Sequence, residues 1–173
     1  MKFLYLAMGL SLFLSCSTKI NFKIANNVDI DKFVTTWYVI AGRFTSFEDG
    51  AHNPVEKYYW SEDRKMIHVE FSFLKDSFEG EKKTIPQKAW VYDKESNAHW
   101  KIQPFWPLML NYLIIAHAKD YSWSAVGVPD QKYLWIMSKK PKMSEDDYSQ
   151  VIQTLELRGY STKNIVKAPQ KWN

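Results

Sequence analysis

The feature that most constrains the fold of this chain is a period-two alternation of apolar and polar residues, which recurs in eight separate segments. It is clearest over residues 65–74, where Ile67, Val69, Phe71 and Phe73 alternate with polar side chains. Successive side chains of a β-strand point to opposite faces, so each segment predicts a strand with one buried face. The predicted strands cover residues 36–44, 55–61, 65–74, 88–92, 99–103, 112–118, 121–128 and 133–138.

Short links join most of these predicted strands, among them residues 93–97, 119–120 and 129–130. Links of this length favour antiparallel neighbours joined as hairpins, in an up-and-down order. Closure of such a meander into a barrel removes its unpaired edges. Aromatic residues make up 16% of the chain, which also favours pleated sheet. The predicted fold class is therefore all-β, an eight-stranded antiparallel up-and-down barrel.

A single helix is predicted after the strands. Ser144 is a favourable N-cap, acidic residues at 145–147 fill the first turn, and Gly159 fits the C-terminal stop. Apolar residues recur between these ends at helical spacing, at Tyr148, Val151, Ile152 and Leu155. One apolar stripe needs one surface to cover, so we expect this C-terminal α-helix to pack on the outside of the barrel.

The N-terminus has the layout of a secretory signal. An apolar run over residues 3–14 follows Met1-Lys2 and is too short to span a bilayer. The small residue Ser15 precedes Cys16, the only cysteine, as in the cleavage sites of bacterial lipoproteins, where the cysteine is acylated. The alternative is an ordinary signal peptide cut elsewhere. We expect a signal peptide at 1–15, a tether at 16–27 and the folded domain at 28–173.

Charge and motifs argue against several other classes of protein. The net charge is +4, but Lys and acidic residues alternate along the chain, which does not favour a nucleic-acid groove. The histidines at 52, 68, 99 and 117 lack metal-ligand spacing, and no nucleophile elbow or phosphate-binding glycine loop occurs. The sequence thus predicts no metal, no cofactor and no catalytic residue. A lipid hydrolase or isomerase that uses Glu48 or His68 is the alternative.

Three ordered motifs carry a family resemblance. Residues 35–43 read TTWYVIAGR and resemble the Gly-x-Trp-Tyr-x-Ile-Ala-Arg opening of bacterial outer-membrane lipoprotein and apolipoprotein D-like lipocalins. Asp120-Tyr121 resembles a hairpin of that family, and PDQKYLWIMSK at 129–139 resembles its last strand. Eight meandering strands followed by a helix is also the lipocalin order. The resemblance extends from about residue 29 to 167.

Two positions depart from the family pattern. Thr35 stands where the family has a glycine, at the tight entry to the first strand. Lys139 stands where the family has an arginine that lies over the residue equivalent to Trp37 and closes the barrel floor. Lysine can make a cation–π contact there but lacks a planar guanidinium, so we expect an intact but weaker floor.

The resemblance implies a cavity with a mostly hydrocarbon wall. An eight-stranded barrel is wide enough either for side chains to fill or for one small ligand to enter. Small residues among large apolar ones favour a ligand. The positions implied to face it are Val39, Ala41, Val69, Phe71, Phe73, Tyr112, Ile114, Ala116, Ser124 and Val126, and in this alternation His117 faces out.

The implied function is to bind, store or transport a small hydrophobic ligand, of the fatty acid or lysophospholipid class. The protein would be anchored through Cys16 in the outer membrane of a Gram-negative bacterium, facing the periplasm, as a monomer or weak dimer. Each pocket residue can also be plain barrel core. A structural envelope protein with a filled barrel therefore stays open as an alternative to ligand binding and to lipid-modifying enzyme activity.

Two predicted loops are placed at the open end by hairpin alternation. Residues 104–110, PFWPLML, expose large apolar groups that could touch a membrane or act as a lid. The alternative is that this loop covers its own barrel. Residues 75–87 are predicted as a charged loop that contains Phe78.

Overall fold

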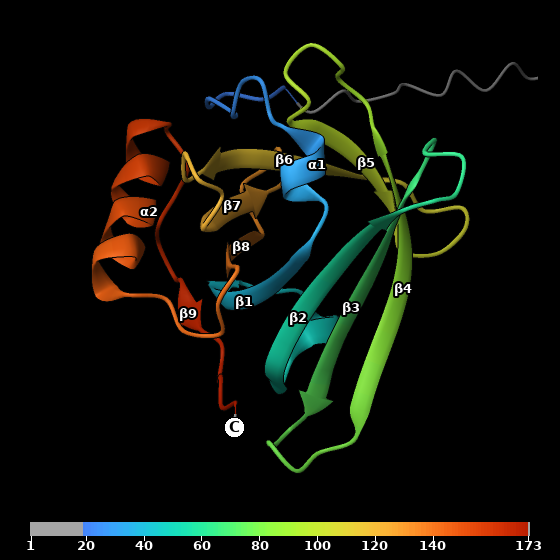
Figure 1. Ribbon diagram of the computed structural model, residues 1–173. Helices are drawn as coiled ribbons and strands as arrows, with labels where there is room; N and C mark the ends of the chain where they lie inside the picture. Colours follow the sequence, from blue (N-terminus) through green and yellow to red (C-terminus); the bar gives the residue numbers. More distant parts are fainter. Residues whose placement is uncertain (1–18, 173) are drawn as a thin grey trace, which may run out of the picture.

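The computed structural model describes residues 19–172, and they form a closed antiparallel barrel (Figure 1). Each strand from β1 to β8 pairs with the next, and β8 pairs back with β1, which closes the ring. The predicted all-β fold class is therefore confirmed. The barrel strands are β1 (Thr36–Arg43), β2 (Ala51–Trp60), β3 (Ile67–Lys75), β4 (Lys82–Val91), β5 (His99–Gln103), β6 (Leu110–His117), β7 (Trp123–Gly127) and β8 (Leu134–Ser138).

Four further elements lie around this barrel. The short helix α1 (Ile30–Phe33) precedes β1, a 3-10 turn η1 (Ser46–Glu48) follows it, and the two-residue strand β9 (Val166–Lys167) pairs with β1. Helix α2 (Glu145–Leu157) lies along the outside of the barrel, in contact with β6 and β7 (Figure 1). The predicted external helix is thus confirmed.

Helix α2 forms where its caps and apolar stripe predict it. The Asp147 N–H donates to Ser144 Oγ at 3.1 Å, which satisfies one of the N–H groups left unpaired at the start of a helix. Val151 and Leu155 are fully buried, whereas Leu157 is exposed. One stripe of the helix therefore holds it on the barrel.

Strand β4 begins earlier than the sequence predicts. Residues 82–89 pair with β3, whereas only 88–91 pair with β5, so the first half of β4 has a single neighbour. Pro86, which lacks an N–H, fits such a one-sided strand. The prediction of a charged loop over 75–87 was wrong, because lysines and a proline that resemble a loop are also typical of an edge strand. Strands β2, β3 and β4 extend beyond the others in Figure 1.

Of three register shifts between strands, one of them between His52 and Val55 in the pairing of β2 with β3, two change which predicted pocket residues face inward. The register shifts between Val39 and Ala41 in the pairing of β1 with β8, and between Ile114 and Ala116 in the pairing of β6 with β7. An extra residue in one strand reverses the alternation beyond it. Side chains after each shift therefore point to the opposite side of the wall from the one that strict alternation predicts.

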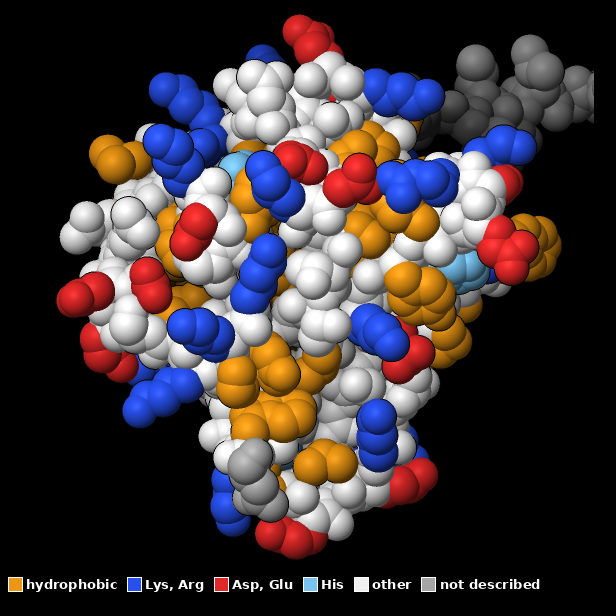
Figure 2. Space-filling view, in the orientation of Figure 1, with side chains coloured by type: hydrophobic (Ala, Val, Ile, Leu, Met, Phe, Trp, Pro, Cys, Tyr) orange, Lys and Arg blue, Asp and Glu red, His pale blue; other side chains and the backbone are white. Residues whose placement is uncertain are grey.

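The C-terminal segment bridges a seam in the barrel. β1 and β2 pair only through residues 36–38 and 55–57. Beyond that point the chain after β9 lies between them, where the Ala168 N–H donates to the Ile40 carbonyl and the Asn53 N–H to the Pro169 carbonyl, each at 2.8 Å. In Figure 2 apolar side chains gather near this C-terminal segment, while Lys and Arg are interleaved with Asp and Glu over the rest of that face.

Candidate functional site

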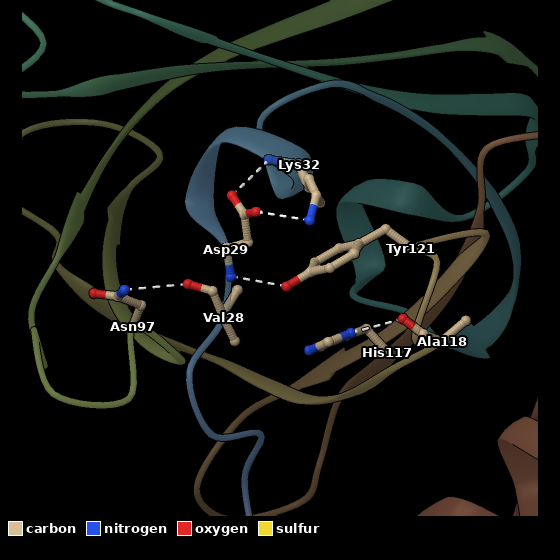
Figure 3. A network of polar contacts seen from close by, with 7 residues as sticks. All are labelled: Val28, Asp29, Lys32, Asn97, His117, Ala118 and Tyr121. Atoms are coloured by element: carbon tan, nitrogen blue, oxygen red, sulfur yellow. Dashed lines mark hydrogen bonds and ion pairs between the residues drawn. The ribbon is translucent and has the colours of Figure 1, made fainter.

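The floor of the barrel is closed by the chain before β1. The Asp29 N–H donates to the Tyr121 hydroxyl at 2.7 Å, and Asn97 Nδ2 donates to the Val28 carbonyl at 3.1 Å. Lys32 donates to Asp29 through its backbone N–H and pairs with it through Nζ at 3.0 Å (Figure 3). These bonds fasten α1 to the β4–β5 and β6–β7 hairpins.

Aromatic rings fill the barrel directly above this floor. The Phe33 ring lies 5.5 Å from that of Trp37, 5.7 Å from that of Tyr58 and 5.2 Å from that of Trp100, measured between centroids. Tyr112 stacks on Trp100 at 5.9 Å. These five residues are buried. The lower part of the barrel is thus packed solid, and any ligand must lie nearer the open end.

Lys139 reaches this floor from the end of β8. Its Nζ lies 5.7 Å from the centroid of the Trp37 ring and 5.9 Å from that of Tyr121, within the range of cation–π contacts. The weakness expected of lysine at this position stays a prediction. Thr35 is not among the described residues with positive φ, so the entry to β1 does not require the conformational freedom of glycine.

Most of the predicted pocket residues belong to the interior cluster of buried side chains. Their ligand-binding role stays a prediction. Ser124 is also buried, and its Oγ donates to the Ala116 carbonyl at 3.2 Å. The predicted residues found in this cluster are Val39, Val69, Phe71, Phe73, Tyr112, Ile114 and Val126.

Two predicted pocket residues lie elsewhere. Ala41 and Ala116 pack in the cluster beneath α2, together with Val151 and Leu155. They follow the two register shifts, so the prediction that they face inward was wrong. For the same reason His117, expected to face out, pairs with Ser124 on the inner side and stacks on the Tyr121 ring at 4.2 Å (Figure 3).

A hollow of about 270 Å³ opens at the mouth, along the β1–β2 seam. The interior residues Phe44 and Phe71 line its inner side, and Pro54 and Glu48 line it from β2 and η1. The C-terminal segment 166–169 forms its outer side. This hollow is the candidate site, because it joins the open end of the barrel to the interior cluster.

A second hollow, of about 560 Å³, lies at the closed end, on the far side of the aromatic floor from the candidate site. Trp60, Met66 and Val91 contribute apolar wall. Arg64, at its edge, already pairs with Asp31 at 2.5 Å and lies 4.5 Å from the Trp60 ring centroid. Arg64 is therefore engaged within the protein, while Lys65 and Lys94 also line this hollow.

A buried polar cluster lies where the hydroxyl groups of the aromatic layer meet Glu56, on the side toward the candidate site. Tyr58 donates from its hydroxyl to Glu56 Oε2, and the Tyr58 and Tyr112 hydroxyls are 2.5 Å apart across the barrel. Burial, with a smaller contribution from the nearby charge of Glu48, raises the pKa of Glu56 to about 7, against the lowering effect of its hydrogen bonds with Tyr58 and Tyr112. A carboxyl group that exchanges its proton near neutral pH therefore faces the inside of the barrel.

Glu48 is the second buried acid. Its Oε1 accepts from Trp135 Nε1 at 2.7 Å, and its Oε2 accepts from the backbone N–H and hydroxyl of Thr45, both at 2.8 Å. Three donors hold this carboxylate in place in the wall of the candidate site. In the sequence, Glu48 stands out only as a residue of the hydrolase or isomerase alternative.

Sequence reasoning missed Glu56 and Tyr58 as site residues. The signal was present, since Glu56, Tyr58 and Trp60 alternate along β2 and Glu56 is the one charged residue of that series. A charge on the apolar face of a strand marks either an error in the assigned face or a functional position. The neighbouring strands β1 and β3 show that Glu56 is on the inner face, because it pairs with the inward-facing Trp37 and Phe71.

The residues of the enzyme alternative do not come together. His68 stacks on Tyr59, which is exposed, whereas Glu48 is buried and bonded to Trp135. Within residues 19–172 no group of three His, Cys, Asp or Glu side chains is arranged to hold a metal ion. Over the same residues no helix is long and apolar enough to cross a membrane.

The apolar loop after β5 is exposed. Trp106 exposes 83% of its surface, and Phe105, Met109 and Leu110 are also exposed. Leu108 is the least exposed of the large apolar residues at 38%. The loop therefore does not bury these side chains against its own barrel.

The comparisons with known proteins agree with this architecture. The family model of the lipocalin-like domain matches residues 28–170. The chain belongs to the lipocalin family. The outer membrane lipoprotein Blc of Citrobacter freundii is 26% identical over 147 residues, which are 85% of this lipocalin and 82% of the relative. The temperature-induced lipocalin-1 of Arabidopsis thaliana is 24% identical, over 86% of this chain and 82% of its own.

Solved structures support the same fold. Insecticyanin of the tobacco hornworm Manduca sexta superposes with a TM-score of 0.66 at 16% identity, covering 88% of this lipocalin and 85% of insecticyanin. Lobster apocrustacyanin A1 superposes with a TM-score of 0.64 at 13% identity, over 88% and 93% of the two chains. The predicted resemblance to bacterial outer-membrane lipoproteins of the lipocalin family is thus confirmed.

Proposed function

We propose that this lipocalin binds a small hydrophobic molecule in the candidate site and stores or carries it in the cell envelope. The observation that carries the proposal is the hollow at the mouth, which leads from solvent to Phe44, Phe71 and the buried cluster beneath them. Apolar walls favour ligands that carry a hydrocarbon chain, because burial removes that chain from water. The ligand classes expected are those with a single acyl chain, such as fatty acids and lysophospholipids.

A fluorescence titration tests this proposal. The full chain is titrated with an uncharged apolar fluorophore, which is then displaced with single-chain lipids. We expect saturable binding at one site. Enlarging Ala51, which lines this hollow, in Ala51→Phe should weaken binding at least about tenfold by narrowing the cup, that is, the open end of the barrel above Glu56. Leu157→Phe, which enlarges an exposed residue of α2, serves as the control. Binding that is absent, or unaffected by Ala51→Phe, would contradict the proposal.

We further propose that the protein is anchored in the outer membrane through Cys16 and faces the periplasm. Support comes from Ser15-Cys16 after an apolar run and from relatives named as outer membrane lipoproteins. Cys16 and the signal at 1–15 lie outside the described residues. Mass spectrometry of the mature N-terminus should find acylated Cys16, and Cys16→Ser should leave the membrane fraction. An unmodified residue 16 would rule out the anchor.

The exposed loop at 104–110 is proposed as a membrane contact. Exposed apolar side chains at the lipid-entry end of a barrel can insert into the acyl boundary of a bilayer. The double variant Trp106→Ser, Leu108→Ser should lower binding of the protein without its anchor to liposomes several-fold. Unchanged liposome binding would show that the loop does not contact lipid.

A further inference from the structure

The inside of the barrel is acidic. Among residues 19–172 the buried charged side chains are Glu48 and Glu56, and neither is a cation. Three lysines near the open end are already engaged. Lys75 Nζ donates to the Asp49 carbonyl, Lys83 Nζ pairs with Glu81, and Lys167, which lines the hollow, pairs with Glu145. A carboxylate or phosphate that entered the cup would lose its hydration without gaining a buried cation as partner.

Glu56 is directly beneath the candidate site. Pro54, which lines the hollow, is two residues before Glu56 on the same face of β2. Phe71, which also lines it, is the partner of Glu56 in β3. Glu56 keeps 6% of its surface accessible and Tyr112 keeps 5%. A group that moves past Phe71 therefore meets this carboxyl next.

The direction of the hydrogen bonds decides what such a group can be. The Tyr58 hydroxyl uses its proton on Glu56 Oε2, so the proton between the two tyrosines belongs to Tyr112. Both tyrosine hydroxyl protons are then used in hydrogen bonds within the cluster. When Glu56 is ionised, the positions left without a hydrogen bond are acceptors, namely Glu56 Oε1 and a lone pair of Tyr112. They fit a head group that donates a hydrogen bond, which a carboxylate cannot do.

We propose that Glu56 and Tyr112 recognise the head of the bound molecule, and that the protein prefers single-chain molecules with an uncharged, hydrogen-donating head, such as a hydroxyl or a primary amide, over carboxylates and phosphates. This inference rests on the proposed function, because it concerns the ligand of the same cup. It narrows the single-chain class named there, since fatty acids and lysophospholipids carry the charged heads that this cup disfavours. It places the head at the bottom of the cup and the chain toward the mouth.

Matched ligands test the preference. Decanol, decanamide and decanoate share one chain and differ in the head, and each is used to displace the uncharged fluorophore from the full chain at a slightly alkaline pH. We expect decanol and decanamide to bind at least about tenfold more tightly than decanoate. Equal or tighter binding of decanoate would overturn the inference while leaving hydrophobic binding intact. If none of the three competes, the proposed function fails together with it.

Two variants test whether the preference for uncharged heads comes from Glu56 and Tyr112. Glu56→Gln removes the charge and adds donors, so the preference over decanoate should fall to within about threefold. Tyr112→Phe removes one acceptor and keeps the charge, so decanol should weaken several-fold while decanoate stays unchanged. Glu62→Gln, the same change at an exposed acid, is the control. Should Glu56→Gln not fold, Tyr112→Phe decides alone, and a preference unchanged in it would refute the assignment.

Discussion

Glu56 is a carboxylic acid that lies buried in the interior of the barrel. An acid in water has a pKa near 4.5, but burial raises that of Glu56 to about 7. The folded protein therefore favours the protonated form, and the unfolded chain the ionised one. Stability from this group is fully present below pH 4.5, falls as the pH rises toward about 7, and is constant above.

A pH series checks this account of Glu56. The free energy of unfolding from urea titrations should fall for the wild type relative to Glu56→Gln between pH 4.5 and about 7. The expected fall is on the order of 3 kcal/mol, which is the free-energy equivalent of the shift. The variant is the reference because it shares every other titrating group. A wild-type minus variant difference that does not change with pH would show that Glu56 is not buried as described.

Lys139 gives a second prediction for a single residue. Its Nζ lies over the Trp37 ring, but lysine cannot stack a planar group there. Lys139→Arg should raise the melting temperature by about 1–2 °C, as expected for a gain of about half a kcal/mol in a chain of this size. Differential scanning calorimetry measures the change. An unchanged or lower melting temperature would show that lysine closes the floor equally well.

At the scale of elements, α2 and the C-terminal segment hold the barrel from outside. Leu155→Ala should lower the free energy of unfolding by about 2–5 kcal/mol, because it leaves a cavity under α2. Leu157→Ala makes the same change at an exposed position of the helix and should cost less than about 0.5 kcal/mol. Urea titrations of both variants test the burial pattern of α2. Equal losses would contradict it.

The seam between β1 and β2 is held in part by one side chain of the C-terminal segment. Gln170 Nε2 donates to the Val39 carbonyl at 2.7 Å and to the Pro54 carbonyl at 3.3 Å, so it bridges the two strands. Gln170→Ala should cost about 1–2 kcal/mol and speed amide exchange in residues 38–41 and 53–56. Exchange in α2 is the internal control. A uniform increase over both regions would indicate general loosening rather than an opened seam.

The elements differ in how well the sequence predicted them, for physical reasons. α2 was predictable because Ser144 and its apolar stripe act locally. The start of β4 was not, because its lysines and Pro86 become a strand only through pairing with β3. The register shifts beside Ala41 and Ala116 also lack a local signal, so strict alternation placed these two side chains on the wrong face.

At the scale of the whole molecule, eight alternating segments with short links were enough to predict a closed barrel, because a meander of that length has few other ways to remove its edges. The contents of the barrel were less predictable. Which inward residues fill the floor and which line a cup depends on rings such as Phe33 and Trp100, brought together from distant segments. Glu56 could be assigned to the inner face only from the pairing of β2 with β1 and β3.

The central claim is that the cup holds a hydrophobic molecule, and native mass spectrometry of the protein purified from its own membranes tests it most directly. We predict a bound molecule at up to one per chain, which dissociation should identify as a single-chain lipid, and a lower occupancy in Ala51→Phe. A protein that carries no such molecule, and takes up none when single-chain lipids are added, would contradict the account.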